Sequence, residues 1–199
     1  MNRLAKAAYG DLQIEDLWLN YFCVSSNLTT TETMVHRQGT LWKAVRISGS
    51  LPGILPPWLQ DNHLLVDGGV LNNLPGDVMQ GICRGIVILV DVSAKEHKTV
   101  ACDKFPSPWS TVWGKFLPGS KPSRNIPGML DVVMRSTVLG SANRIRTIKN
   151  NADYYFNPPV NEFGLLAFDQ LNRIAEAGYL YAGEKIQELK KHHQRFPFG

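Results

Sequence analysis

The chain has 199 residues, of which 44% are hydrophobic and 19% are charged, and its formal net charge is +4. This composition is typical of a globular domain and excludes a chain that is mainly disordered. The basic residues are dispersed rather than gathered into a Lys/Arg block. We therefore expect no nucleic-acid partner, whereas a mildly basic surface suits anionic lipid headgroups.

The cysteines and histidines indicate the redox state of the compartment and whether a metal site is expected. The three cysteines are widely spaced, which predicts no disulfide framework and favours a reducing compartment. The histidines show no metal-ligand spacing, so we expect no metal and no other cofactor. We see no signal peptide and no apolar run of the ~20 residues that a membrane helix needs. The sequence thus predicts a cytoplasmic protein that is peripheral to a membrane at most.

The first third of the chain mixes strand-like and helix-like segments. Residues 1–9 and 40–48 are predicted to be helices. Residues 16–24, rich in large apolar side chains, are predicted to be a strand that continues into a polar loop or edge segment. Residues 49–57 contain several prolines and glycines, which break both periodicities and predict an irregular segment.

The next segments indicate the fold class. Residues 64–67 are predicted to be a short buried strand, and residues 74–83 a helix capped by Asn72 or Asn73. Residues 86–92 form a fully apolar strand, which needs cover on both faces. Strand, helix and strand in this order predict a βαβ unit. The expected fold is therefore α/β, with a mostly parallel sheet between helix layers.

The rest of the chain divides into two parts. Residues 93–127 are rich in proline and are predicted to form an irregular excursion. Residues 128–199 are predicted to be a helical portion, with helices over 129–150 and 168–192 and a short strand within 153–160.

An aromatic stripe lies within the irregular excursion. Trp109, Trp113 and Phe116 fall on one face of a short helix in the stretch "FPSPWSTVWGKF", with lysines around them. Aromatic rings next to cations suit a membrane interface, so we predict a peripheral membrane contact here. The alternative is a flap that packs on the body of the domain.

A carboxylate followed by two glycines is the principal candidate site. Asp67 closes the apolar strand in "HLLVDGGVLNNLP", and ligands of α/β proteins bind beyond the carboxyl ends of strands. Gly68 and Gly69 leave room for another backbone or a substrate to approach. From this pattern alone, a turn aspartate that binds backbone amides remains an alternative reading.

Several stretches together identify a family. "IEDLWLNYFCVSSNLTT", "LWKAVRISGSLPG", "LPGILPP", "DGGVLNNLP" and "IVILVDV", in this order, resemble the patatin-like phospholipase family, and within it catalytic domains of the neuropathy target esterase type. The resemblance implies hydrolysis of phospholipids or lysophospholipids by a serine–aspartate dyad, without a cofactor. It makes Asp67 the base, with Gly68 and Gly69 shaping its turn.

The sequence departs from that family in one respect. It contains no Gly-x-Ser-x-Gly elbow for the nucleophile and no glycine-rich oxyanion loop. We therefore interpret residues 1–199 as the C-terminal part of one patatin-like phospholipase (PNPLA) domain, which carries the base and needs the N-terminal half of the same domain as a partner. The resemblance implies that Ser48 and Ser50 lie near the site, but neither stands on an elbow turn between a strand and a helix. A non-catalytic truncated remnant or a lipid-binding, regulatory module is the alternative function.

Overall fold

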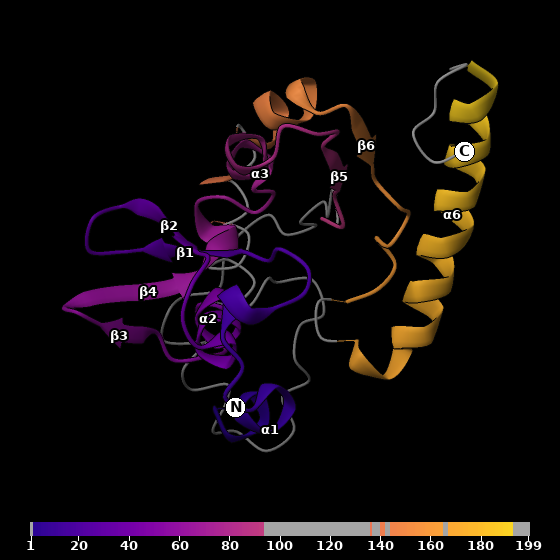
Figure 1. Cartoon of the computed structure of the whole chain (residues 1–199). Helices are drawn as coiled ribbons and strands as arrows, with labels where there is room; N and C mark the ends of the chain where they lie inside the picture. Colours follow the sequence, from indigo (N-terminus) through magenta and orange to yellow (C-terminus); the bar gives the residue numbers. More distant parts are fainter. Residues whose placement is uncertain (1, 94–135, 137–139, 142–143, 165–166, 193–199) are drawn as a thin grey trace, which may run out of the picture.

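A four-stranded antiparallel sheet forms the first part of the molecule in the computed structural model (Figure 1). Its strands lie in the order β2-β1-β4-β3. Their bounds are Cys23–Asn27 for β1, Glu32–His36 for β2, Trp58–Gln60 for β3 and His63–Asp67 for β4. The structure describes residues 2–93, 136, 140–141, 144–164 and 167–192.

The mostly parallel sheet expected from the sequence is wrong for this part of the chain. β4 is antiparallel to both of its neighbours, β1 and β3. The reason is a tight turn, in which Asp61 and Asn62 adopt φ angles of 49° and 62°. Two consecutive positive φ angles fold β3 directly back onto β4 as a hairpin, and Asp and Asn tolerate that conformation well. With both edges of β4 occupied, the strand after the next helix cannot pair with it.

The predicted strand at residues 16–24 is also displaced. Ile14–Asp16 form a short 3₁₀ helix, an irregular stretch follows, and β1 begins at Cys23. The prediction relied on large apolar side chains, but they do not mark the buried strand. The buried residues of β1 include Ser25 and Ser26, both with 0% exposure. Cross-strand pairing with β2 and β4, rather than side-chain hydrophobicity, selects this strand.

Two N-terminal helices were predicted correctly. α1 spans Asn2–Tyr9, and α2 spans Leu41–Ser48 with Thr40 in the cap position. α2 packs against β1 and β4, and α1 packs against α2. Ile14, Leu41 and Ala44 form a small buried cluster beside the sheet. The segment after α2 is irregular, as expected.

A second unit lies above the sheet in Figure 1. It contains α3 (Gly76–Ile82) and two parallel strands, β5 (Ile88–Val90) and β6 (Tyr154–Phe156). Residues 144–151 are helical and add Ile148 to a core made with Leu74, Val87 and Leu89. The predicted βαβ order is therefore present, but β5 pairs with β6 and not with β4.

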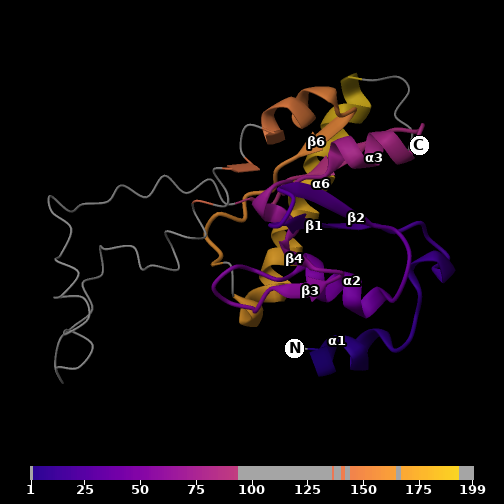
Figure 2. The ribbon, with the colours of Figure 1, turned by 90° about the vertical axis from the view of Figure 1, so that its left-hand side faces the viewer.

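The last helix, α6 (Leu171–His192), follows a single 3₁₀ turn at Phe168–Gln170. It was predicted over 168–192. Figures 1 and 2 show it running along one side of the molecule, past β6. No described residue of α6 is buried, and Leu171 at its start is exposed. Most of the irregular excursion, with Trp109, Trp113 and Phe116, lies outside the described residues.

β5 is covered on one face only, which corrects the expectation that both faces are buried. Val87 and Leu89 face the core, with exposures of 3% and 6%, whereas Ile88 and Val90 are 40% and 54% exposed. Ile86 and Val92, on the same alternating face, are also exposed. β5 therefore presents an apolar stripe that lacks cover among the described residues.

Two isosteric substitutions test this one-sided burial. Val87→Thr is expected to lower the free energy of unfolding by about 1–3 kcal/mol, because the new hydroxyl enters a dry core. Val90→Thr is expected to change it by less than about 0.5 kcal/mol, as is usual for surface positions. Urea denaturation followed by circular dichroism measures both. Equal losses at the two positions would mean that the outer face of β5 is covered.

Candidate functional site

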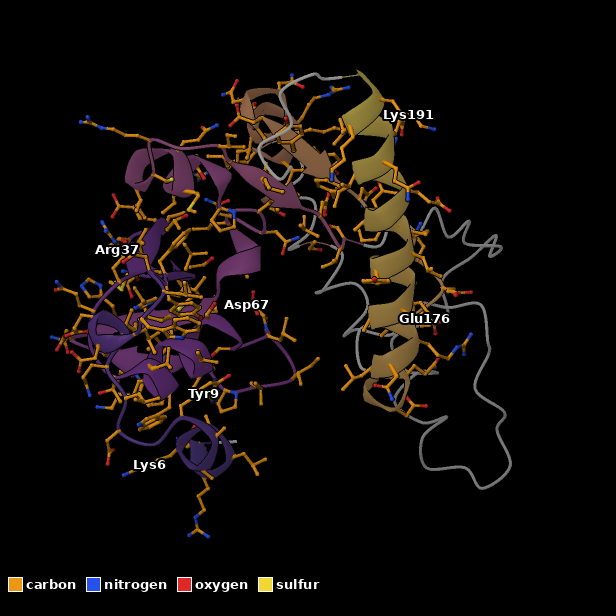
Figure 3. All side chains as sticks on the ribbon, turned by 45° about the vertical axis from the view of Figure 1, so that its right-hand side comes forward. Lys6, Tyr9, Arg37, Asp67, Glu176 and Lys191 are labelled. Carbon is orange, nitrogen blue, oxygen red and sulfur yellow. The ribbon has the colours of Figure 1, made fainter. Side chains whose placement is uncertain are left out.

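Asp67 lies at the end of β4, where the main chain turns out of the sheet, and Figure 3 shows it in the middle of the molecule. It is paired in register with Ser25 of β1, and its backbone N–H donates to the carbonyl oxygen of Ser50 at 3.0 Å. The half-buried carboxylate lines a cavity of about 310 Å³. The other residues around this cavity, here called the Asp67 cavity, are Phe22, Cys23, Val24, Ser48, Gly68, Gly69, Asn72, Asn73 and Pro75.

The turn after Asp67 is held by two side chains. Oδ1 of Asp67 accepts a hydrogen bond of 2.7 Å from the backbone N–H of Gly69. Oγ of Ser26 donates to the carbonyl oxygen of Gly68 at 3.3 Å and accepts from the backbone N–H of Leu71 at 3.1 Å. Among the described residues, Oδ2 of Asp67 has no hydrogen-bond partner. One oxygen of the carboxylate thus fixes its orientation, and the other is available to a ligand.

Burial and hydrogen bonding act in opposite directions on the Asp67 carboxyl. Desolvation disfavours the charged form and raises its pKa above the usual range, while the hydrogen bond from Gly69 partly offsets this. A carboxylate with a raised pKa takes up a proton more readily than an exposed one, which is what a general base requires.

Gly68 and Gly69 both stand where other atoms come close to the main chain. A Cβ on Gly68 would lie 2.5 Å from the carbonyl oxygen of Val24, so β1 approaches the turn too closely for any side chain. A Cβ on Gly69 would lie 2.9 Å from Oδ1 of Asp67 and 2.9 Å from Oδ1 of Asn73. Gly68 therefore admits no side chain, and a side chain at Gly69 would displace the Asp67 carboxylate or the Asn73 amide.

Neither of the two local serines is placed as a nucleophile. Ser50 is fully buried; its Oγ donates to the carbonyl oxygen of Arg46 and accepts from the Arg46 guanidinium at 2.5 Å. Ser48 lines the Asp67 cavity at the end of α2, but no hydrogen bond joins it to Asp67. Ser25 forms a hydrogen bond of 2.8 Å with Nε2 of His36, yet it is fully buried, so no substrate reaches it.

Cys23 is a cavity residue that the sequence did not single out. Cys23 lines the Asp67 cavity, and burial raises the pKa of its thiol despite hydrogen bonds from Tyr21 and Ser48 that favour the thiolate. Because the thiolate is the nucleophilic form, this cysteine is a poor nucleophile near neutral pH. Its position follows from β1 starting at residue 23, which only the pairing with β2 reveals.

Asn72 links the Asp67 turn to the second unit. It is 1% exposed; its backbone N–H donates to the carbonyl oxygen of Gly68 at 2.8 Å, and its Nδ2 donates to Asp77 at 2.9 Å. Asp77 in turn accepts from Arg144 at 2.6 Å. Desolvation acts to raise the pKa of Asp77, but the hydrogen bonds from Arg144 and Asn72 outweigh it and hold that pKa below its usual range. Residues 144–151 thus brace the turn that carries Asp67.

A second cavity in the described part of the chain lies away from Asp67. A larger cavity of about 530 Å³ lies beside α2 and β3, but it shares no residue with the Asp67 cavity. The described part of the chain contains no cluster of three side chains suited to a metal ion. None of the helices in that part is both long and apolar enough to cross a membrane.

A pair of glycine substitutions tests the close approach at the turn. Gly68→Ala is expected to lower the free energy of unfolding by about 1–3 kcal/mol, because its Cβ overlaps the Val24 backbone. Gly81→Ala is the matched control, since a Cβ there meets no atom within 4 Å. In α3 this change is expected to stabilise the fold by about 0.5–1 kcal/mol. The melting temperatures of the two variants measure these changes. A Gly68→Ala variant that melts at the temperature of the parent would contradict the close approach of β1 to the turn.

A charge-removing substitution tests the raised pKa of Asp67. Between the ordinary aspartate pKa and the raised folded pKa, the folded state binds more protons, so the Asp67 contribution to stability falls as pH rises through this window. Above the window, burial of the charge destabilises the fold. Asp67→Asn is therefore expected to melt no lower than the parent at pH 7, with any advantage fading towards pH 4. A lower melting temperature at pH 7 would contradict the burial argument.

Comparison with known proteins agrees with the family suggested by the motifs. Residues 1–79 match the family model "Patatin-like phospholipase". The chain is 32% identical over 195 residues to "Neuropathy target esterase sws" of Drosophila melanogaster, covering 96% of this chain and 14% of that protein. It is 35% identical over 196 residues to "Lysophospholipase NTE1" of Candida albicans, covering 95% and 14%.

Human "Patatin-like phospholipase domain-containing protein 6" is 33% identical over 185 residues, which cover 90% of this chain and 13% of that protein. The chain therefore spans only a small fraction of each of these relatives. The family match includes Asp67, Gly68 and Gly69, and the likeness to the relatives extends over nearly the whole chain. The chain belongs to the patatin-like phospholipase family.

Proposed function

We propose that this chain contributes the general base, Asp67, to the hydrolysis of an acyl ester in a phospholipid or lysophospholipid. The single observation that carries the proposal is the half-buried carboxylate of Asp67, which lines a cavity with one oxygen held and the other unpaired among the described residues. The name of the Candida relative, a lysophospholipase, supports the substrate class.

The chemistry needs a carboxylate of this kind. A serine hydroxyl attacks the ester carbonyl carbon, and its proton passes to the carboxylate of Asp67. The same proton then passes to the departing alcohol as the tetrahedral intermediate collapses. Water hydrolyses the acyl-serine in the same way, with Asp67 again taking and returning a proton. Direct contact between serine and aspartate explains why no histidine is required.

The nucleophile in this proposal comes from residues that are not in the sequence. No Gly-x-Ser-x-Gly elbow occurs in the chain, and Ser25 and Ser50 are fully buried. The apolar stripe of β5, exposed at Ile88 and Val90, supports this view, because a strand of this composition is normally covered on both faces. The 199 residues are then the C-terminal part of one patatin-like domain, whose N-terminal half supplies the serine and the oxyanion loop.

A non-catalytic role is the second candidate. A remnant or a lipid-binding, regulatory module needs no nucleophile, which fits the buried state of Ser25 and Ser50. Such a role does not account for a carboxylate at a cavity that is followed directly by a glycine, Gly68, at a position that admits no side chain. Ester hydrolysis uses all of these features, so we favour it.

The deciding experiment compares this chain with a form extended upstream to the next in-frame start codon. Each is given a p-nitrophenyl ester and a serine-directed organophosphonate probe. Turnover and labelling are expected only in the extended form, and Asp67→Asn is expected to reduce turnover by about 10²–10⁴-fold, the usual contribution of a general base. Labelling of the short chain would place the nucleophile within it. Absence of turnover in both forms would favour the non-catalytic role.

The acid limb of the pH profile gives an independent check. Asp67 acts as a base only when ionised, and burial raises its pKa. The kcat/KM of the extended form is therefore expected to fall, on acidification, at a pH above the ordinary aspartate value of about 3.9. A profile that stays flat down to that value would argue against Asp67 as the titrating base.

A further inference from the structure

Asn73 lines the Asp67 cavity in an exposed position and has an unexpected set of contacts. Its place just before α3 predicts a helix cap, but α3 begins at Gly76 with Pro75 in the cap position and no side-chain cap. Instead, Nδ2 of Asn73 donates to Oγ of Ser93 at 3.2 Å, a residue twenty positions away in the segment that follows β5. The side-chain amide of Asn73 therefore binds Ser93 and does not cap α3.

The network around Ser93 fixes which way this amide points. The Ser93 hydroxyl has one proton, and it donates that proton to Oδ1 of Asp91, which also accepts from the Ser93 backbone N–H at 2.9 Å. An ionised carboxylate only accepts hydrogen bonds, so Ser93 must donate to it and can only accept from Asn73. The NH₂ group of Asn73 therefore faces Ser93, and its carbonyl oxygen faces the other way.

Asp91 is itself fixed by β6. The carboxylate accepts a hydrogen bond of 2.6 Å from the hydroxyl of Tyr155, and the backbone carbonyl of Asp91 accepts one of 2.6 Å from Nδ2 of Asn157. Asp91 is 3% exposed. The amide orientation of Asn73 is thus determined by a chain of hydrogen bonds that is partly buried near β6 and reaches Asn73 at the Asp67 cavity.

The result is a pair of acceptor oxygens on one side of Gly69. Oδ1 of Asn73 and Oδ1 of Asp67 each lie 2.9 Å from the point where a Cβ of Gly69 would stand. Two acceptors so placed repel an anion and attract groups that carry protons. Oδ1 of Asp67 already accepts from the backbone N–H of Gly69, and in the proposed reaction the nucleophile hydroxyl donates to Oδ2, which leaves the Asn73 oxygen for a second donor.

We propose that Asn73 determines substrate specificity: its side-chain carbonyl oxygen accepts a hydrogen bond from a hydroxyl or ammonium group close to the scissile ester. This inference rests on the proposed function. A free glycerol hydroxyl next to the ester, or the ammonium of an ethanolamine headgroup, satisfies the acceptor. A neighbouring acylated hydroxyl has no proton to donate and leaves the Asn73 oxygen unpaired. The phosphate of the substrate points away from Asp67 and Asn73.

The test measures a ratio of kcat/KM in the form of the protein that hydrolyses the p-nitrophenyl ester. The ratio compares lysophosphatidylcholine with its 2-deoxy analogue, which lacks the glycerol hydroxyl. A second ratio compares the 2-deoxy ethanolamine and choline lipids, and so isolates the ammonium group. Asn73→Leu is expected to lower one of these ratios by about 3- to 10-fold, as expected for the loss of one hydrogen bond.

Two further variants separate recognition from general damage. Ser93→Ala releases the amide and is expected to lower the same ratio in the same direction, by less than Asn73→Leu. Asn172→Leu, at an exposed position on α6, is the matched control and is expected to leave both ratios unchanged. A purely structural role of Asn73 would reduce all substrates alike and would not move either ratio.

The outcomes separate this inference from the proposed function. If Asn73→Leu leaves both ratios unchanged in an active enzyme, Asn73 is not a specificity residue, although the esterase function stands. If no form of the protein hydrolyses the p-nitrophenyl ester, the esterase function fails and the role of Asn73 fails with it. A fall in the first ratio identifies the hydroxyl as the donor, and a fall in the second identifies the ammonium.

Discussion

The pairing of β4 with β1 is the constraint on which the site depends. It places Asp67 opposite Ser25 at the end of the strand and sets Ser26 beside the following turn. A shift of this pairing by one residue would turn the carboxylate to the opposite face of the sheet. The hydroxyl of Ser26 then closes the turn by binding both Gly68 and Leu71. Small polar residues in β1 are therefore needed for the geometry of the carboxylate, even though they add little hydrophobic burial.

The position of Asp67 at the end of a strand could be predicted from the sequence, because the residues that indicate it are neighbours in the chain. An apolar run that ends in an acid and two glycines allows few structures, and both glycines lie where a Cβ would collide with β1 or with the carboxylate. The helices over residues 2–9 and 41–48 were predictable for the same reason, because helical periodicity is contained within a short segment.

The sheet could not be predicted in the same way, because strand pairing depends on distant residues. The apolar strand at 86–92 suggested a parallel sheet, but the turn at Asp61 and Asn62 pairs β4 with β3 on one edge and β1 occupies the other. The contacts of Asn72 with Asp77 and of Asn73 with Ser93 were equally hidden. Asparagine before a helix is usually a cap, and only the folded chain shows that both amides are engaged elsewhere.

These contacts show how two small units together present one carboxylate. The antiparallel sheet positions Asp67, but the second unit holds the turn through Arg144, Asp77 and Asn72. The same unit orients Asn73 through Asp91 and Ser93. Burial raises the pKa of Asp67, and a single backbone hydrogen bond keeps its orientation. A base that is destabilised by burial needs rigid support from outside its own sheet. Asn72 provides such support, because its backbone N–H binds the Asp67 turn at Gly68 and its side-chain amide donates a hydrogen bond to Asp77 of the second unit.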